Sequence, residues 1–157
     1  MLYEPLCAYL SQVTGGHLVK LDVSREETFA CNRVRHAIRS HIISYVRPDG
    51  TFVARKLEAF SNQGAYASHG HSVVAKGMGA FPQLYPCPNV EADSYTVFTN
   101  RPVAGAMRGY GIPQAMFAVE SHTDDVAKAI GMSPLEFRRK NLMPKGFVDG
   151  FSKNENY

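Results

Sequence analysis

The sequence predicts an α+β fold, a mixed sheet with a β-hairpin and flanking helices. Two β-rich runs, residues 37–46 and 51–60, are separated by Arg-Pro-Asp-Gly at 47–50. Proline presets the first angle of such a turn and glycine accepts a positive one, so the runs form a hairpin. A glycine-rich loop and two helical segments follow. Because strands come first and helices last, the order is not a regular βαβ alternation.

The N-terminal part of the chain predicts two helices and a short strand. Apolar residues recur at helical spacing over 2–13, and a glycine pair follows them. Residues 17–23 alternate between polar and apolar side chains, as in a strand. Ser24 and Glu27 have the spacing of a capping box, which predicts at least one helical turn.

The middle of the chain predicts a helix, an irregular segment and a strand. Residues 70–79 have helical spacing, although they contain several glycines. Three prolines in 81–89 exclude a regular helix or a central strand there. Residues 94–98 are β-rich and predict a strand that leads into the glycine-rich loop.

The C-terminal part predicts two helices. An apolar stripe runs from Ile112 to Ile130 and is followed by a glycine. Ser133 is expected to cap a second helix, with a proline at its first position and Glu136 completing a capping box. Pro144 ends that helix, and residues 149–157 form a polar tail.

Composition limits the classes of partner. The 157 residues are 45% hydrophobic and 20% charged, which is typical of a packed soluble domain. The net charge of +3 comes from scattered basic residues, so we expect neither a nucleic acid nor a membrane surface as partner. No apolar run approaches the roughly 20 residues of a membrane-spanning helix, and the start does not resemble a secretory signal.

The cysteine and histidine patterns indicate no metal site. Cys7, Cys31 and Cys87 form neither a CxxC pair nor a disulfide framework. We therefore expect three buried thiols, a reducing compartment and a cytoplasmic protein. The six histidines offer one close pair, at 69 and 71, with no third ligand at useful spacing.

The loop at residues 100–114 has the strongest chemical pattern. Its three glycines permit positive backbone angles and close approach of a ligand to the main chain. A loop that leads into a helix directs free amides outward, where they can hold an anion or an oxo group. Arg108 adds a fixed positive charge, and Tyr110 adds a flat face for stacking. These features fit an oxygen-rich anionic or metal-oxo ligand beside a planar substrate, but glycines at such a junction can also serve the turn alone.

Three segments resemble a known family in one consistent order. Residues 106–114 (AMRGYGIPQ) are similar to the AFRGFGGPQ signature of molybdenum hydroxylases of the xanthine dehydrogenase family. Residues 133–142 (SPLEFRRKNL) resemble the family's DPLELRRKNL, and 62–68 (NQGAYAS) resemble its NNGAYAS. Arg35-His36 before the hairpin and the opening Tyr-Glu-Pro-Leu at 3–6 also match. The resemblance, closest to bacterial xanthine or purine dehydrogenases, identifies residues 1–157 as a fragment of a molybdopterin-binding domain.

The resemblance also implies site residues. Arg108 and Gly109 correspond to positions that contact the molybdopterin–molybdenum cofactor, which we expect in the cytosine dinucleotide form or a similar one. Tyr110 corresponds to an aromatic position, usually phenylalanine, that stacks on the substrate. Lys76 is the nearest basic residue to the position of an arginine that orients purines, although lysine lacks the bidentate geometry of arginine.

The implied activity is oxidation of a purine, hypoxanthine or xanthine, with water as the oxygen source. Iron–sulfur and FAD centres are expected on other subunits or domains. The family's general-base glutamate is expected outside this chain, so we predict no hydroxylase activity from the 157 residues alone. Two alternatives stay open: a relative that acts on nicotinate or an aromatic acyl-CoA, and a non-catalytic fragment or assembly module.

Overall fold

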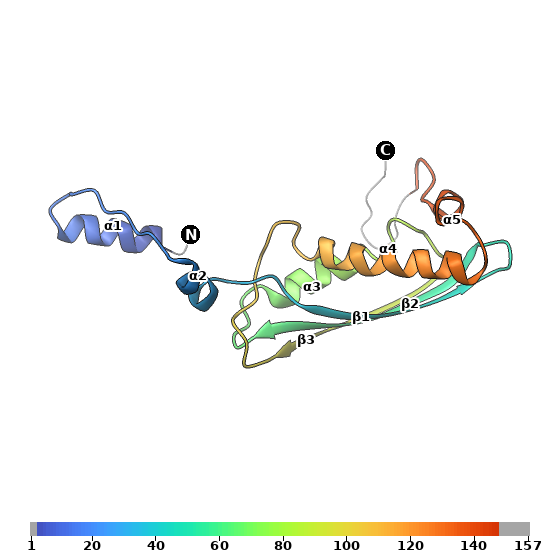
Figure 1. Cartoon of the computed structure of the whole chain (residues 1–157), viewed down its shortest axis with the longest axis horizontal. Coiled ribbons are helices and arrows are strands. Elements are labelled where there is room, and N and C mark those ends of the chain that lie inside the picture. The colour runs from blue at the N-terminus through green and yellow to red at the C-terminus, as the bar shows by residue number, and fades with distance from the viewer. Residues whose placement is uncertain (1–2, 148–157) are drawn as a thin grey trace. The chain divides into compact units, whose positions relative to one another are not determined.

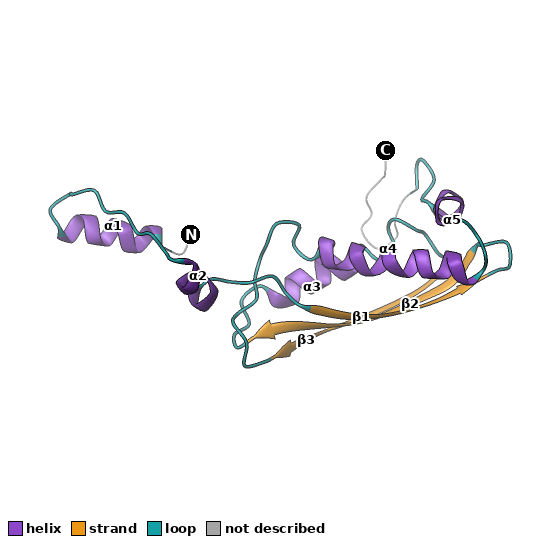
Figure 2. Cartoon of the chain, in the orientation of Figure 1, coloured by secondary structure: helices purple, strands orange, loops and turns teal. Residues whose placement is uncertain are grey.

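The computed structural model describes residues 3–147, and the predicted tail at 149–157 lies outside them. The chain divides into two compact units, Met1–Asn32 and Arg33–Tyr157. Figure 1 follows the chain from its N-terminus, and Figure 2 separates its helices from its strands. None of the helices in the described part has the length and apolarity needed to cross a membrane.

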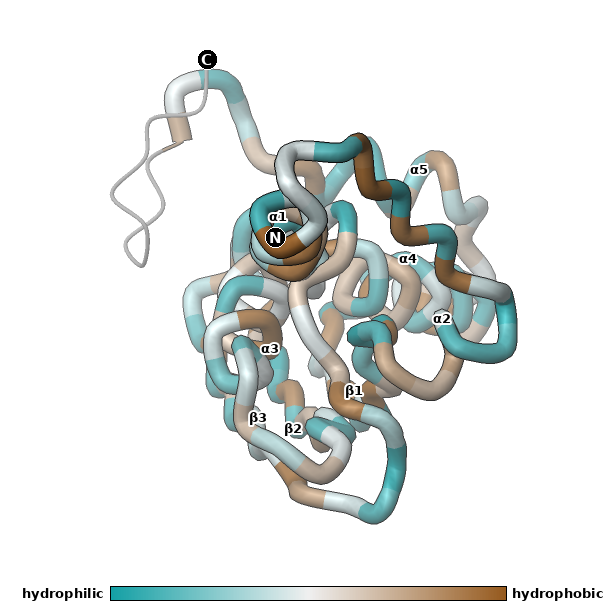
Figure 3. The backbone as a smooth tube through the Cα atoms, turned by 90° about the vertical axis from the view of Figure 1, so that its left-hand side faces the viewer, coloured by the Kyte–Doolittle hydropathy of each residue, from teal (hydrophilic) through white to brown (hydrophobic). Residues whose placement is uncertain are grey.

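The first unit contains two helices, α1 (Glu4–Val13) and α2 (Arg25–Cys31). The predicted capping box is present at α2. The Glu27 amide donates to Ser24 Oγ at 3.2 Å, and the Ser24 amide donates to the Glu27 carboxylate at 2.8 Å. Helix α1 buries none of its residues, although several of them are hydrophobic, as the brown parts of the tube at α1 in Figure 3 show.

Two predictions for the first unit are wrong. Residues 17–23 form no strand, and Leu18 is almost fully exposed. Alternation favours a strand only where a second strand accepts its backbone hydrogen bonds, and the described residues of this unit contain no such partner. The expected burial of the cysteines is also wrong: Cys31 is exposed, with its thiol donating to the carbonyl of Glu27 at 2.8 Å, and Cys7 and Cys87, the latter in the second unit, are only half-buried.

The second unit is built on a mixed sheet of β1 (Ile38–Val46), β2 (Phe52–Gly64) and β3 (Asn89–Phe98), in that order. Strands β1 and β2 form the predicted antiparallel hairpin, and β2 pairs with β3 in parallel. The α+β prediction is confirmed. Strand β3 begins five residues before the predicted strand at 94–98. Most of its side chains are exposed and show no alternation in burial, so the sequence carries no periodic signal for its first half.

The helices of this unit are α3 (Gly70–Gly79), α4 (Ile112–Ala129) and α5 (Pro134–Asn141). Helices α3 and α4 cover one face of the sheet (Figure 1). The predicted side-chain cap at Ser133 is wrong, because its side chain makes no capping hydrogen bond and only its carbonyl accepts from Phe137, at 2.9 Å. Proline at the first helical position already fixes the entry geometry.

The core lies between the sheet and its helices. Helix α4 fully buries every fourth residue from Ala115 to Ala127, and Met116 and Val126 of the predicted stripe pack half-buried against the core. The central buried side chains are Phe52, Leu57, Ala59, Val74, Met78, Phe81, Tyr85, Ala115, Val119, Ala127 and Phe137.

A buried arginine within this core was not predicted. Arg55 is 1% exposed, and its Nη1 donates to the carbonyls of Phe81 and Tyr85 at 3.2 and 3.0 Å. Its guanidinium carbon lies 4.2 Å from the ring centroid of Phe81 and 4.8 Å from that of Phe52. Burial lowers the pKa of Arg55 to about 10. Aromatic faces and two carbonyls contact this cation, and the charge of Glu120 favours it without direct contact.

Candidate functional site

The glycine-rich loop is anchored at its start by main-chain hydrogen bonds. The amide of Gly105 donates to the carbonyl of Val34, and the amide of Ala104 donates to the carbonyl of Gln63, both at 3.0 Å. Val34 and Ala104 also form an isolated parallel bridge. The loop therefore leaves the sheet at a fixed point, beside the end of β2.

The other end of the loop packs directly on the backbone of α3. Gly111, the N-cap of α4, has a φ of +91°. A Cβ built on Gly111 would lie 2.2 Å from the carbonyl oxygen of Val73, and one on Gly77 would lie 2.7 Å from the carbonyl oxygen of Gly111. Only glycine allows both the angle and this approach. The contact holds the loop and α3 together.

Arg108 and Gly109 lie on the exposed part of the loop. Gly109 has a φ of +91°, and a Cβ there would lie 2.6 Å from Cγ of Pro113. Its glycine requirement thus comes first from the turn into α4. The carbonyl of Arg108 accepts a 2.7 Å hydrogen bond from Nη2 of Arg35, so the main chain is fixed while the Arg108 side chain stays exposed.

Tyr110 has a strained backbone and a fixed hydroxyl. Its φ is +46°, in the left-handed region that costs a non-glycine residue of order 1–3 kcal/mol. The hydroxyl lies 2.9 Å from Nδ1 of His69, and the two rings meet edge to face with centroids 6.3 Å apart. The sequence indicated His69 only as half of a histidine pair, because a contact across 41 residues leaves no local signal.

Lys76 is exposed on α3, next to Gly77, the residue that packs on Gly111. The structure therefore brings the helix that carries Lys76 against the loop that carries Arg108 and Tyr110. His69 and Lys76 both belong to the α3 side of this junction, and the loop forms the other side.

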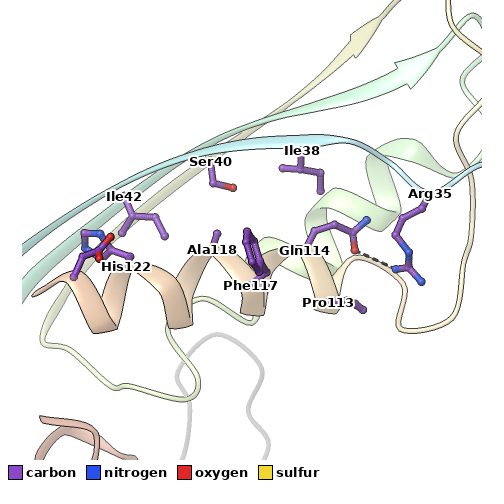
Figure 4. Close-up of a pocket in the computed structure, with 10 residues that line it drawn as sticks. Arg35, Ile38, Ser40, Ile42, Pro113, Gln114, Phe117, Ala118 and His122 are labelled. Carbon is purple, nitrogen blue, oxygen red and sulfur yellow. Dashed lines mark hydrogen bonds between the residues drawn. The ribbon is translucent and has the colours of Figure 1, made fainter. Parts of the chain in front are cut away.

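A groove of about 550 Å³ separates β1 from α4 and ends beside the loop (Figure 4). Arg35 lies at that end and donates to Oε1 of Gln114 at 3.2 Å, while Nε2 of Gln114 donates to the carbonyl of His36 at 3.1 Å. The side chains that line the rest of the groove are Ile38, Ser40, Ile42, Pro113, Phe117, Ala118, His122 and Asp125.

The charge of the loop suits an anion. Residues 99–119 contain Arg101 and Arg108 and no aspartate or glutamate, and both arginines are exposed. An exposed guanidinium beside left-handed main chain offers directional donors to phosphate or oxo oxygens. The donor set therefore fits an oxygen-rich anionic cofactor. Within the described range, no group of three or more His, Cys, Asp or Glu side chains could hold a metal ion.

Residues 1–142 match the family model of the molybdopterin cofactor-binding domain, so the chain belongs to this family. It is 46% identical over 146 residues to a xanthine dehydrogenase molybdenum-binding subunit from Escherichia coli O157:H7, covering 93% of this chain and 19% of that protein. It is 38% identical over 128 residues to the nicotinate dehydrogenase large molybdopterin subunit of Eubacterium barkeri, covering 82% and 30%.

Solved structures agree with this assignment. Quinoline 2-oxidoreductase from Pseudomonas putida 86 has a TM-score of 0.80 and 27% identity, covering 96% of this chain and 20% of that one. The aldehyde oxidoreductase of Desulfovibrio desulfuricans has a TM-score of 0.79 and 25% identity, covering 92% and 16%. The chain thus spans about a fifth of the length of most of these relatives.

Proposed function

We propose that this chain forms one wall of the active site in the molybdenum-cofactor subunit of a xanthine dehydrogenase-like hydroxylase. The substrate is a purine, hypoxanthine or xanthine, and water supplies the oxygen. The observation that carries the proposal is the loop at 105–111, an exposed arginine and a strained tyrosine held against α3. The 46% identity to a protein named as a xanthine dehydrogenase subunit favours the purine.

The residues have distinct roles in this proposal. Arg108 and the main chain at Gly109 hold the anionic part of a molybdopterin cofactor in its cytosine dinucleotide form. When bound, that cofactor supplies the two-electron chemistry that oxidises the ring carbon. Tyr110 offers an aromatic face on which a planar ring stacks. The ammonium group of Lys76 orients a polar edge of the substrate as a point charge rather than as a bidentate donor.

The remaining parts of the enzyme lie outside residues 1–157 in this proposal. The general-base glutamate belongs to another segment of the subunit, and iron–sulfur and FAD centres on partner subunits or domains carry the electrons away. Residues 1–157 alone are expected to be inactive. Free thiols at Cys7, Cys31 and Cys87 favour a reducing compartment, the cytoplasm.

A second substrate class has its own support. The relative named as a nicotinate dehydrogenase subunit shares 38% of its aligned residues with this chain. Nicotinate is also a planar heteroaromatic with a polar edge, so stacking on Tyr110 and attraction by Lys76 suit it as well. A substrate panel of hypoxanthine, xanthine, nicotinate and an aromatic acyl-CoA separates these possibilities.

The test recovers the complex that contains this chain from its source cells and measures molybdenum and substrate-dependent dye reduction. Molybdenum together with purine oxidation supports the proposal. Molybdenum together with turnover of another ring keeps the hydroxylase role but contradicts the purine as substrate. A complex without molybdenum contradicts the enzymatic role and favours a non-catalytic module.

A matched pair of variants then tests the loop. Arg108→Ala is expected to lower molybdenum content and turnover by about tenfold or more, as loss of a charge-assisted contact predicts. Arg101→Ala removes another exposed arginine from the same loop and controls for net charge. Equal losses in the two variants would contradict a specific role for Arg108.

A further inference from the structure

We propose that His69 is a positioning residue that fixes the ring of Tyr110 and, with the tyrosine hydroxyl, selects substrates by their polar edge. The inference rests on the proposed function, in which Tyr110 stacks on the substrate. It adds the N-cap residue of α3 to a site for which the sequence indicated Arg108, Gly109, Tyr110 and Lys76.

The contact is specific to the two side chains. Tyr110 Oη lies 2.9 Å from Nδ1 of His69, and the ring planes meet at 85°. His69 is the N-cap of α3, but its side chain makes no capping hydrogen bond. The His69 imidazole therefore hydrogen-bonds to Tyr110 and does not cap its own helix.

The backbone on both sides of this contact is strained. Among residues 3–147, the only non-glycine residues with positive φ are Ser68 at +38° and Tyr110 at +46°. One immediately precedes His69 and the other carries the hydroxyl. Such strain persists only where surrounding structure enforces it, and it concentrates at functional sites.

The start of α3 is also fixed by its close packing on the side chain of Gln63. Gly70 packs on the side chain of Gln63 so closely that a Cβ would lie 1.0 Å from its Oε1. Nε2 of Gln63 donates to the carbonyl of Tyr66 at 3.0 Å. The backbone that carries His69 is therefore fixed by its neighbours. The hydrogen bond of His69 consequently restricts the rotation of the Tyr110 ring.

The hydroxyl keeps capacity for one further partner. If Tyr110 donates to His69, its oxygen can still accept from a ring N–H of the substrate. If Nδ1–H of His69 donates, the tyrosine O–H is free to donate to an exocyclic oxygen. Purines offer both kinds of group beside a flat ring, whereas an apolar ring offers neither. A phenylalanine at 110 would stack equally on both.

The experiment measures kcat and KM of the molybdenum-loaded enzyme with hypoxanthine and with quinoline, a ring without a carbonyl or N–H. Tyr110→Phe and His69→Ala are each expected to raise the KM for hypoxanthine about tenfold, with kcat within about twofold. The double variant should be no worse than either single variant. The KM for quinoline should change less than about twofold.

Two controls separate positioning from general damage. His69→Asn keeps a hydrogen-bonding atom close to the place of Nδ1 and should restore most of the lost affinity. His71→Ala removes an exposed imidazole two residues away and should behave as the parent enzyme. Additive losses in the double variant, or equal effects of His69→Ala and His71→Ala, would overturn the proposal.

The two proposals fail in different ways. An enzyme that turns over nicotinate but no purine contradicts the proposed substrate, and the same variants then test His69 with nicotinate. Equilibrium binding of each ring, measured by calorimetry on the same variants, requires no turnover. Absence of binding by every ring overturns both proposals.

Discussion

Arg35 and Arg108 are joined by a 2.7 Å hydrogen bond from the Nη2 of one to the carbonyl oxygen of the other. A second donor of the same guanidinium, Nη1, reaches Oε1 of Gln114 on the first turn of α4. One planar side chain thus spans the loop and the helix that follows it. The two arginines have different roles. The side chain of Arg35 fixes the main chain at Arg108, and the side chain of Arg108 stays exposed.

Replacement of Arg35 by lysine tests this clamp. An ammonium group lacks the planar fork that directs two separate nitrogens at these two acceptors, so lysine does not reproduce both contacts in this geometry. We expect turnover and molybdenum content of the enzyme to fall by about tenfold, as for other groups that orient residues at a cofactor. The thermal midpoint should change little, since Arg35 is exposed. Arg39→Lys is the matched control, and equal activity of both variants would contradict the clamp.

The contact between Gly111 and Val73 predicts a large loss of stability in Gly111→Ala. The new methyl group would lie 2.2 Å from a backbone oxygen, in addition to the strain of a φ of +91°. We expect a loss of about 3 kcal/mol or more in the free energy of unfolding, measured by urea titration. Gly131→Ala has a φ of +70° and no atom within 4 Å, so it should lose only about 1 kcal/mol.

Asn141 links the hairpin to α5 by two buried hydrogen bonds. Its Nδ2 donates to the carbonyl of Gly50 at 2.8 Å, and its Oδ1 accepts from the amide of Phe52 at 3.1 Å. Asn141→Ala leaves these buried groups without partners and should cost about 2–3 kcal/mol of unfolding free energy. Lys140→Ala removes only a surface ion pair with Asp49 and should cost less than about 1 kcal/mol. Similar losses would show that the buried amide has no special role.

Stability should fall as the pH falls below neutrality. Burial lowers the pKa of His36, and the side chain of Gln63 raises it by a smaller amount. Neither ring nitrogen of His36 has a hydrogen bond of good geometry to a described residue. Burial and the charge of Arg55 lower the pKa of His122 in the same direction. Below the ordinary value of 6.5 the unfolded chain binds more protons than the folded chain, so this stability is present at higher pH and is lost on acidification.

Urea midpoints between pH 7.5 and 5.5 measure this dependence. The parent chain should lose stability steadily across the window, and His36→Gln should show a smaller slope because only His122 still contributes. His71→Gln is the control for loss of one exposed imidazole. A slope in His36→Gln equal to that of the parent would contradict the prediction.

Local patterns were enough for several elements. The Arg-Pro-Asp-Gly turn predicted the hairpin, which the register of β1 and β2 confirms. The Ser24 capping box and the helix after Gly111 were also predicted, because caps, turns and periodicity act over a few residues. The family signature in 106–114 predicted the membership that the family model confirms.

Other features had no local signal. A strand was expected at 17–23 from alternation alone, but it lacks a partner strand in the described unit. The ion pair at 2.5 Å between Asp124 of α4 and Arg138 of α5 was not predicted. Buried Arg55 was not predicted, because its aromatic surroundings come from segments up to 30 residues away.

The sequence by itself determined the hairpin, the main helices and the family, since each depends on residues close together in the chain or on a short run of residues that resembles a family signature. Only the tertiary structure decided that Gly77 lies against Gly111, that Arg35 binds the main chain of Arg108, and that His69 meets the hydroxyl of Tyr110. These contacts join residues 34 to 73 positions apart. Packing of α3 and α4 on one face of the sheet creates them, and no local pattern encodes that packing.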